Sequence, residues 1–242
     1  MVRTVLQAFC FFLAASCVTS AVASSEESKV LRTVEQTLSL KSKPSSIRKI
    51  PKLGLYEIVA DKNIFYVDKN VRYVIAGQIF DTQQKVNITE KRIAELSKIP
   101  WKSLPLKDAI KVVYGKGERR LAVFTDTNCT YCQLLEQSIR QIGNITVYNF
   151  LHPTPRSRDL SRRIFCAPDP TRAFQDYMLS GKQPDHNFAG KCDSSALDRN
   201  LALGRRLGIA GTPVMIFSDG SSQAGSLAPS DLNARLNSVN GE

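Results

Sequence analysis

Apolar positions in the first third of the chain change from a helical to an extended spacing. Between residues 27 and 40, Val30, Val34 and Leu38 recur every four residues, which predicts a helix with one apolar stripe. Pro44 follows the end of this stripe, and short runs of branched and aromatic residues come after it. Polar, turn-forming triplets separate these runs. We therefore expect three strands, at Leu55–Val59, Ile64–Val67 and Tyr73–Ile75.

A polar stretch follows these predicted strands. We expect a short helix capped by Thr89, with Ile93 and Leu96 on one face. Two prolines then interrupt the pattern. Residues 87–104 are therefore predicted to be a partly helical connector between a small β-rich segment and a larger second region.

The second region begins near Lys111 and has a strand–helix–strand pattern. The continuous apolar run Leu121–Thr125 is typical of a buried strand. After a short polar loop, Leu135, Ile139 and Ile142 mark an amphipathic helix. The other elements expected here are a strand at Ile145–Phe150, polar helices within residues 155–205 with a stop at Gly181, a strand at Val214–Phe217, and a last helix around Leu232, Leu236 and Val239.

The N-terminus has the pattern of an export signal. Arg3 precedes an apolar run over residues 5–18, which is too short for a stable membrane-spanning helix, and a small-residue cleavage pattern ends at Ala23. We therefore expect residues 1–23 to be a signal peptide that is removed on export. Lipidation at Cys17 is the rival interpretation, although the residue three positions before it is smaller than a lipidation site prefers.

Composition and charge narrow the class of protein. The chain has 242 residues, of which 43% are apolar, so a packed core is expected. The formal net charge is +11, but the lysines and arginines are scattered, with no long basic run and no aromatic-interleaved basic stripe. This distribution indicates a basic surface and argues against a nucleic-acid interface.

The strongest candidate chemistry is the C-x-x-C pair formed by Cys129 and Cys132, between a predicted strand and a predicted helix. At the first turn of a helix, unpaired backbone N–H groups and the helix dipole favour the thiolate. We therefore predict that Cys129 is the nucleophile that forms a mixed disulfide with a substrate. Cys132, one turn later, is predicted to be the more buried thiol that resolves it.

A C-x-x-C pair has other uses, which remain as alternatives. A zinc site needs four clustered ligands, and Cys166, Cys192 and the two histidines lack ligand spacing. A purely structural bridge is a weak explanation, because closing so short a loop removes little chain entropy. Redox catalysis is thus the favoured interpretation. A metal-binding module and a holdase chaperone with incidental cysteines are the rivals from other classes.

Three further side chains, two histidines and a tryptophan, are of types that often carry a role. His152 follows a predicted strand and is a candidate general base, but an ordinary solvated loop position is favoured. His186 lies in a polar segment and has no expected role in catalysis. Trp101, in the connector, is expected to serve in packing or docking.

The motifs resemble a known family. Phe124-Thr125-Asp126 before Cys129-Thr130-Tyr131-Cys132, with Gly211-Thr212-Pro213 downstream, is similar to the DsbC/DsbG family of bacterial periplasmic disulfide isomerases. Thr130 departs from the Gly usual in DsbC, and Thr130 and Tyr131 are the two positions that would tune the nucleophile. The resemblance implies an α+β chain with a cystatin-like N-terminal dimerisation domain (24–86), a connector (87–104) and a thioredoxin-like catalytic domain with a helical insertion (105–242).

The resemblance also implies roles for individual residues. Pro213 would follow a cis peptide bond beside the active site, and the backbone of Thr212 would pair with an extended substrate near the Cys129 sulfur. Cys166 and Cys192 would form a structural disulfide inside the helical insertion, with a second redox-active pair as the alternative.

The function implied is isomerisation of non-native disulfides in exported proteins, by a periplasmic homodimer joined through its N-terminal segments. A membrane reductase of the DsbD type would keep the enzyme reduced. No metal, nucleotide or organic cofactor is implied. A dithiol oxidase, or a dedicated reductant of one partner protein, is the alternative within the oxidoreductases.

Overall fold

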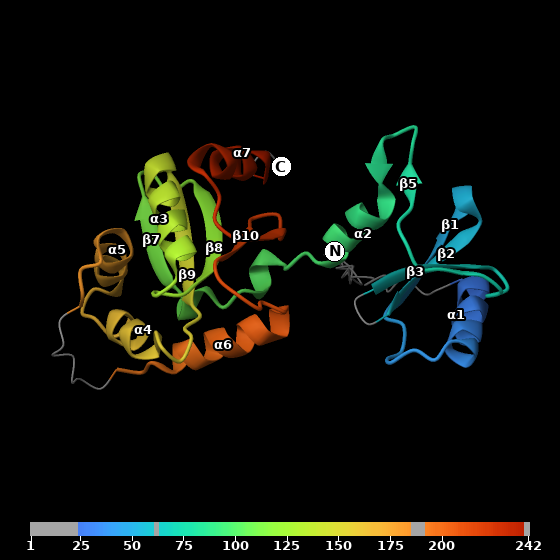
Figure 1. The fold of residues 1–242 in the computed structure, drawn as a ribbon, viewed down its shortest axis with the longest axis horizontal. Coiled ribbons are helices and arrows are strands. Elements are labelled where there is room, and N and C mark those ends of the chain that lie inside the picture. Colours follow the sequence, from blue (N-terminus) through green and yellow to red (C-terminus); the bar gives the residue numbers. More distant parts are fainter. Residues whose placement is uncertain (1–23, 61–62, 185–191, 240–242) are drawn as a thin grey trace, which may run out of the picture. The chain divides into compact units, whose positions relative to one another are not determined.

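The computed structural model describes residues 24–60, 63–184 and 192–239. The chain divides into two compact units, Met1–Thr89 and Glu90–Glu242 (Figure 1). The predicted signal peptide, Cys17 and His186 lie outside the described residues. Within the described ranges, no helix combines the length and the apolar character needed to cross a membrane.

The N-terminal unit places one helix against an antiparallel sheet. Helix α1 (Ser25–Thr37) buries Val30 and Val34 against the sheet, which confirms the predicted apolar stripe. The helix ends before residue 40, because Leu38 is already extended and serves as its C-cap. Leu38 still packs at the margin of the same core.

The sheet of this unit has the strand order β1-β2-β3-β4. The predicted strands correspond to β2 (Leu55–Ala60), β3 (Asn63–Asp68) and β4 (Val74–Ile75), and are confirmed. Strand β1 (Ser46–Ile50) was not predicted, because Arg48 and Lys49 break its apolar pattern. A separate two-stranded hairpin is formed by β5 (Phe80–Asp81) and β6 (Val86–Asn87).

Helix α2 (Ile88–Leu96) differs from its prediction at the cap. Thr89 lies inside the first turn, so the prediction that it caps the helix was wrong. Its hydroxyl is instead hydrogen-bonded to the Tyr66 hydroxyl and accepts the Ile79 backbone N–H at 3.0 Å. The Thr89 hydroxyl is therefore used by groups of the β-rich unit, and it does not cap the first turn of α2.

The rest of the connector is partly helical, as predicted. The apolar face expected on α2 is open, since Ile93 and Leu96 are 42% and 44% exposed. Two 3₁₀ turns follow, η2 (Trp101–Ser103) and η3 (Leu106–Asp108). The Trp101 ring lies edge-on to Tyr148 with centroids 6.1 Å apart, which confirms a packing role.

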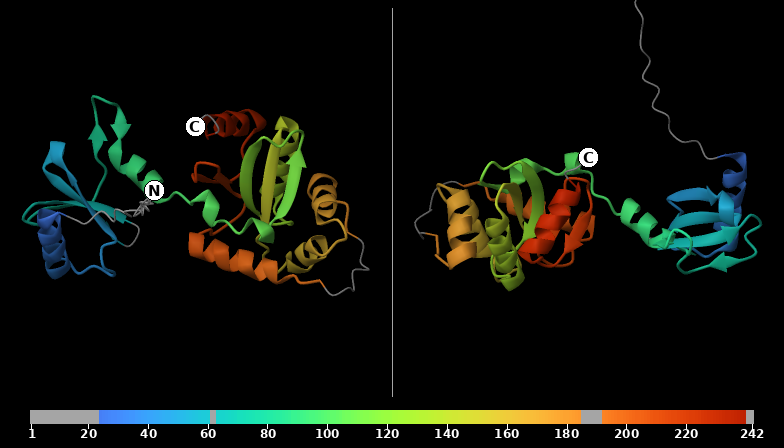
Figure 2. Two further views of the ribbon diagram at one scale, coloured as in Figure 1. Left: turned by 180° about the vertical axis from the view of Figure 1, so that it is seen from behind. Right: turned by 90° about the horizontal axis from the view of Figure 1, so that it is seen from above.

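The second unit is built on a five-stranded sheet with the order β11-β10-β8-β9-β7 (Figures 1 and 2). Strands β8 and β9 are parallel and the other neighbours are antiparallel. Strands β8, β9 and β10 confirm the three predicted strands, whereas the edge strands β7 and β11 were not predicted. The strands are β7 (Ile110–Tyr114), β8 (Arg119–Thr125), β9 (Ile145–Leu151), β10 (Val214–Phe217) and β11 (Ser222–Ala224).

Helices cover both faces of this sheet (Figures 1 and 2). Helices α3 (Thr130–Ile142) and α7 (Pro229–Val239) pack on the face that carries Leu121 and Val123. Helix α6 (Ser195–Leu207) packs on the opposite face, with Ala122 and Phe124. Alternate residues of β8 thus enter two cores. The strand is fixed between them, and it ends at the loop that leads to Cys129.

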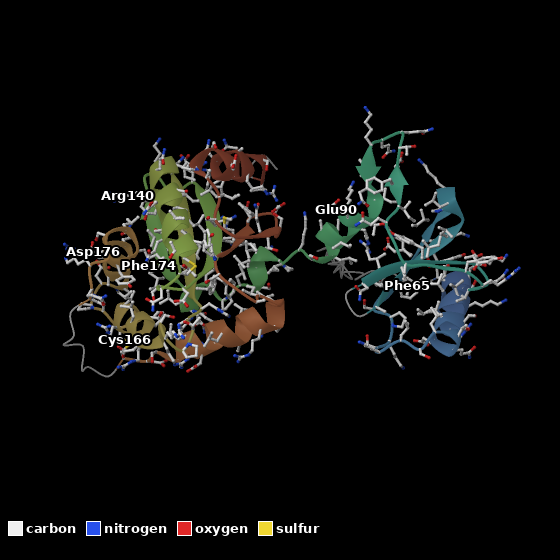
Figure 3. The ribbon with its side chains drawn as sticks, in the orientation of Figure 1. Phe65, Glu90, Arg140, Cys166, Phe174 and Asp176 are labelled. Atoms are coloured by element: carbon white, nitrogen blue, oxygen red, sulfur yellow. A yellow bond between two sulfur atoms is a disulfide. The ribbon has the colours of Figure 1, made fainter. Side chains whose placement is uncertain are left out.

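A helical insertion follows β9. The helical stretch expected over residues 155–205 consists of α4 (Arg158–Phe165), α5 (Pro170–Ser180) and α6, and Gly181 ends α5 in a left-handed conformation, as predicted. Cys166 and Cys192 form a disulfide with their Cα atoms 5.7 Å apart. Phe174 of α5 packs in the same core as Cys132, and Figure 3 labels it together with Cys166.

Candidate active site

The turn from β8 into α3 places Cys129 at the helix N-cap. Its sulfur accepts a hydrogen bond from the Cys132 backbone N–H at 3.3 Å. Neither cysteine is in a disulfide. A sulfur in this position takes up one of the unpaired N–H groups of the helix and faces the positive end of its dipole. The local geometry therefore provides what a nucleophilic cysteine needs.

The two cysteines differ in exposure. Cys129 is half-buried, whereas Cys132 is 2% exposed and packs with Leu151, Phe174 and other apolar residues. Burial, together with the interaction with Cys129, raises the pKa of the Cys132 thiol to about 12. One sulfur is thus available to a large substrate, and the other is kept protonated beneath it.

The residues before β10 come to the same place. The peptide bond between Thr212 and Pro213 is cis. The Cys129 thiol lies within hydrogen-bonding distance of the Thr212 carbonyl oxygen, with sulfur and oxygen 3.4 Å apart. The structure therefore brings Thr212 and Pro213 to the pair Cys129 and Cys132, an association that the sequence had offered only through a resemblance.

A buried acid connects the active-site loop to the loop after β9. Asp126 is 4% exposed, and its two carboxylate oxygens accept the backbone N–H groups of Asn128 at 3.0 Å and Thr154 at 2.9 Å. Sequence reasoning used Asp126 only as part of a motif. The sequence did offer one signal for this role, a carboxylate directly after a buried strand. An acid in that position usually accepts backbone hydrogen bonds and so holds a loop in place.

These loops border a groove beside the nucleophile. Its walls include Asn128, Thr154, Arg156 and Thr212, and Cys129 lies among them. Tyr131, in the first turn of α3, is 65% exposed. The site therefore combines a reactive sulfur, an accessible backbone segment and an exposed ring, and these features suit a peptide substrate.

His152 occupies a different environment from the one predicted. Its ring lies edge-on to Phe124 with centroids 6.1 Å apart, and a Cβ added to Gly204 would collide with it. Burial lowers the pKa of His152. The expectation of an ordinary solvated loop position was therefore wrong. His152 is a half-buried packing residue, and it is not among the residues that line the groove with Cys129.

Sequence reasoning also missed a buried acid on α3. The Glu136 carboxylate lies in the core and accepts a hydrogen bond from the Tyr114 hydroxyl at 2.6 Å. Burial raises the pKa of Glu136 to about 7 and also raises the pKa of Tyr114. Glutamate is rarely fully buried, so nothing in the helical pattern marked Glu136 as a core residue.

The described part of the chain contains no group of three or more His, Cys, Asp or Glu side chains arranged to hold a metal ion.

Both units are similar to known protein domains. Residues 106–240 match the family model of a thioredoxin-like domain, and residues 21–90 match that of the disulfide bond isomerase protein N-terminal domain. The predicted fold class is thereby confirmed.

Named relatives agree with these matches. A probable thiol:disulfide interchange protein DsbC from Bordetella pertussis is 38% identical over 194 residues, covering 79% of this chain and 68% of the relative. The thiol:disulfide interchange protein DsbC of Escherichia coli strain K12 is 27% identical over 215 residues, covering 84% of this chain and 86% of the relative.

A solved structure is similar as well. A disulfide interchange protein from Neisseria gonorrhoeae has 31% sequence identity and a TM-score of 0.53, covering 57% of this chain and all of that chain. The chain therefore belongs to the DsbC family of thiol:disulfide interchange proteins, the disulfide-isomerising oxidoreductases.

Proposed function

We propose that Cys129 and Cys132 are the redox centre with which this chain isomerises non-native disulfides in exported proteins. One observation carries the proposal. The Cys129 sulfur accepts the Cys132 N–H at 3.3 Å at the start of α3, and it lines a groove on the protein surface. A sulfur held there faces the helix N-terminus and is accessible to a substrate, which suits a disulfide-exchange nucleophile.

In the proposed reaction the Cys129 thiolate attacks one sulfur of a substrate disulfide. A bond forms between the two sulfurs, the substrate disulfide breaks, and the second substrate sulfur leaves as a thiolate that takes up a proton. Another substrate thiolate then attacks the mixed disulfide. That step forms the new substrate disulfide and returns Cys129 to its reduced state, so no net oxidation or reduction takes place.

Cys132 provides a second way to resolve the mixed disulfide. Its sulfur attacks Cys129, the reduced substrate leaves, and a Cys129–Cys132 disulfide remains that needs two electrons from outside. We propose a membrane reductase of the DsbD type as their source. Because burial raises the pKa of Cys132, its attack on the mixed disulfide is slow, and the substrate has time to rearrange while it is bound to Cys129.

The neighbouring residues support substrate binding in this scheme. The carbonyl of Thr212, before Pro213, is 3.4 Å from the Cys129 sulfur, so an extended peptide that pairs with this backbone segment would bring its own sulfur to the nucleophile. Thr130 and Tyr131 would tune the nucleophile, since they form the turn of helix between the two cysteines. We assign a structural role to the Cys166–Cys192 disulfide, which closes the helical insertion across 26 positions of sequence.

The N-terminal unit supports a homodimer. Strand β4 is the last strand of its sheet, and its residues Val74 and Ile75 are exposed, as are Tyr73 and Phe80. An exposed apolar sheet edge is suited to pairing with another strand. We propose that residues 24–86 form this dimerisation domain, that 87–104 connect it, and that 105–242 form the catalytic domain, in a protein of the periplasm.

Trapping the mixed disulfide tests the proposed nucleophile. A Cys132→Ser chain should accumulate a covalent complex with a scrambled disulfide protein, released by dithiothreitol and absent when Cys129 is also replaced by Ser. If the double variant still gives the complex, Cys129 is not the attacking residue. If the double variant suppresses aggregation but neither chain forms the complex, the protein is a holdase with incidental cysteines.

A further inference from the structure

We propose that Arg156 makes the groove beside Cys129 selective for substrate segments that carry an acidic side chain next to the cysteine under attack. This inference rests on the proposed function, because it concerns the substrate of the same nucleophile. It adds a specificity-determining residue that lies outside the C-x-x-C motif and on another element of the fold.

The exposed charge in this groove is positive. Arg156 is exposed and lines the groove together with Cys129 and Thr212. The groove also has an acidic member, Asp126, but that carboxylate is buried and accepts two backbone N–H groups. A substrate peptide entering the groove therefore meets the guanidinium of Arg156 and the positive N-terminal end of α3.

The loop that carries Arg156 is held in place. The Thr154 N–H is bound by Asp126 at 2.9 Å. The fully buried Ser157 donates its backbone N–H to the Thr154 carbonyl at 3.1 Å, and its hydroxyl also contacts Thr154. Pro155 restricts the backbone between them. Arg156 thus extends from a fixed loop, and its charge is presented at a defined side of the groove.

Arginines nearby are engaged with acids of the protein itself. Arg158 pairs with Asp198 at 2.6 Å, and Arg163 pairs with Asp159 at 3.0 Å. For Arg156 no ion pair is found within the residues that the structure describes. Its charge is therefore available to a substrate carboxylate without the loss of an internal ion pair.

The expected selectivity is modest and electrostatic. A guanidinium can bind a carboxylate through two parallel hydrogen bonds, whereas it repels a lysine at the same place. Exposed ion pairs change equilibria or rates by about two- to fivefold. Salt screens such pairs, so the preference should weaken at about 1 M ionic strength.

The test uses two short peptides that carry the same activated disulfide and differ only in a Glu or a Lys beside the cysteine. The reduced full-length protein attacks each peptide at low ionic strength, and the release of the leaving thiol gives the second-order rate constant. The wild-type chain should attack the Glu peptide about two- to fivefold faster. Arg156→Gln should weaken the preference, and Arg156→Glu should reverse it.

Arg172→Glu is the matched control, since it makes the same change in charge on α5, outside the groove, and should keep the wild-type preference. Cys129→Ser should attack neither peptide. Equal rates for the two peptides in the wild type, or an unchanged preference in Arg156→Glu, would overturn the role of Arg156 and leave the nucleophile intact. Attack that persists without Cys129 would instead overturn the proposed function.

Discussion

The Thr212 carbonyl oxygen lies 3.4 Å from the Cys129 sulfur, although 83 positions of sequence separate the two residues. The adjacent strands β8 and β10 create this proximity, since Phe124 pairs with Val214 in the sheet. The nucleophile and the backbone segment proposed to hold the substrate are thus attached to neighbouring strands of one rigid sheet.

The cap geometry predicts that replacing Cys129 by Ser preserves the fold. A serine hydroxyl can accept the Cys132 N–H as the sulfur does, and serine is a favoured N-cap residue. Cys129→Ser should therefore differ from the reduced wild type by less than about 0.5 kcal/mol, whereas Cys129→Ala should lose about 1 kcal/mol. Urea denaturation of the reduced proteins measures both differences in stability. Equal stability of the Cys129→Ser and Cys129→Ala chains would contradict the role of the sulfur as a helix cap.

The difference in burial predicts that the two thiols react at very different rates. Because Cys132 is 2% exposed and burial raises its pKa to about 12, it has almost no thiolate at pH 7. In the reduced chain, iodoacetamide should modify Cys129 at least about 100-fold faster than Cys132. Peptide mapping by mass spectrometry after short exposures would reveal this order, and comparable labelling of both cysteines would refute it.

The buried acid on α3 predicts a pH-dependent stability. Burial raises the pKa of Glu136 from 4.5 to about 7, so the folded state binds a proton more tightly than the unfolded state. The contribution of this group to stability should be full below about pH 4.5 and fall by about 3 kcal/mol as the pH rises to about 7. Glu136→Gln keeps an acceptor for the Tyr114 hydroxyl and has no charge to bury.

Urea midpoints of the wild type and of Glu136→Gln, measured from pH 4.5 to 8, test this pH dependence. The difference in unfolding free energy between Glu136→Gln and the wild type should grow in favour of the variant as the pH rises to about 7. If the two curves run parallel, the acid does not titrate in the core as described.

The Asp126 carboxylate links two loops, and we expect its removal to lower the free energy of unfolding. Asp126→Ala leaves the N–H groups of Asn128 and Thr154 without the acceptor that the buried carboxylate provides. The loss should be about 1–3 kcal/mol in unfolding free energy. Asp126→Asn keeps one carbonyl oxygen and should lose less, so thermal unfolding of both variants gives a graded result. A neutral Ala variant would contradict the link.

Local patterns were sufficient to predict the proposed catalytic pair. The apolar run of β8 and the spacing of Leu135 and Ile139 each have a short period, so a strand, a loop and a helix around Cys129 could be predicted without any tertiary information. The interpretation of two regions joined by a connector has the same origin, because the hydrophobic period changes along the chain.

Features that depend on distant pairs could not be predicted in this way. The sequence around Thr89 is that of a helix cap, but its hydroxyl is hydrogen-bonded to Tyr66 of strand β3. Asp126 binds Thr154 across 28 positions, and Glu136 binds Tyr114 across 22. His152 looked like a loop residue because nothing in its neighbourhood along the chain indicates that Gly204 leaves room for its ring. Each of these polar groups is explained only by a partner that the fold brings to it.

The most direct test of the central claim is the refolding of a scrambled, fully oxidised multi-disulfide protein by the mature chain in a glutathione buffer, with the Cys129→Ser chain alongside. If Cys129 is the isomerising nucleophile, the wild type should restore substrate activity and the folded variant should fall to the rate of the buffer alone. Recovery that is equal in the two chains would contradict the account. Absence of recovery with rapid oxidation of a reduced substrate, or rapid reduction of insulin, would assign the same site to an oxidase or a reductase.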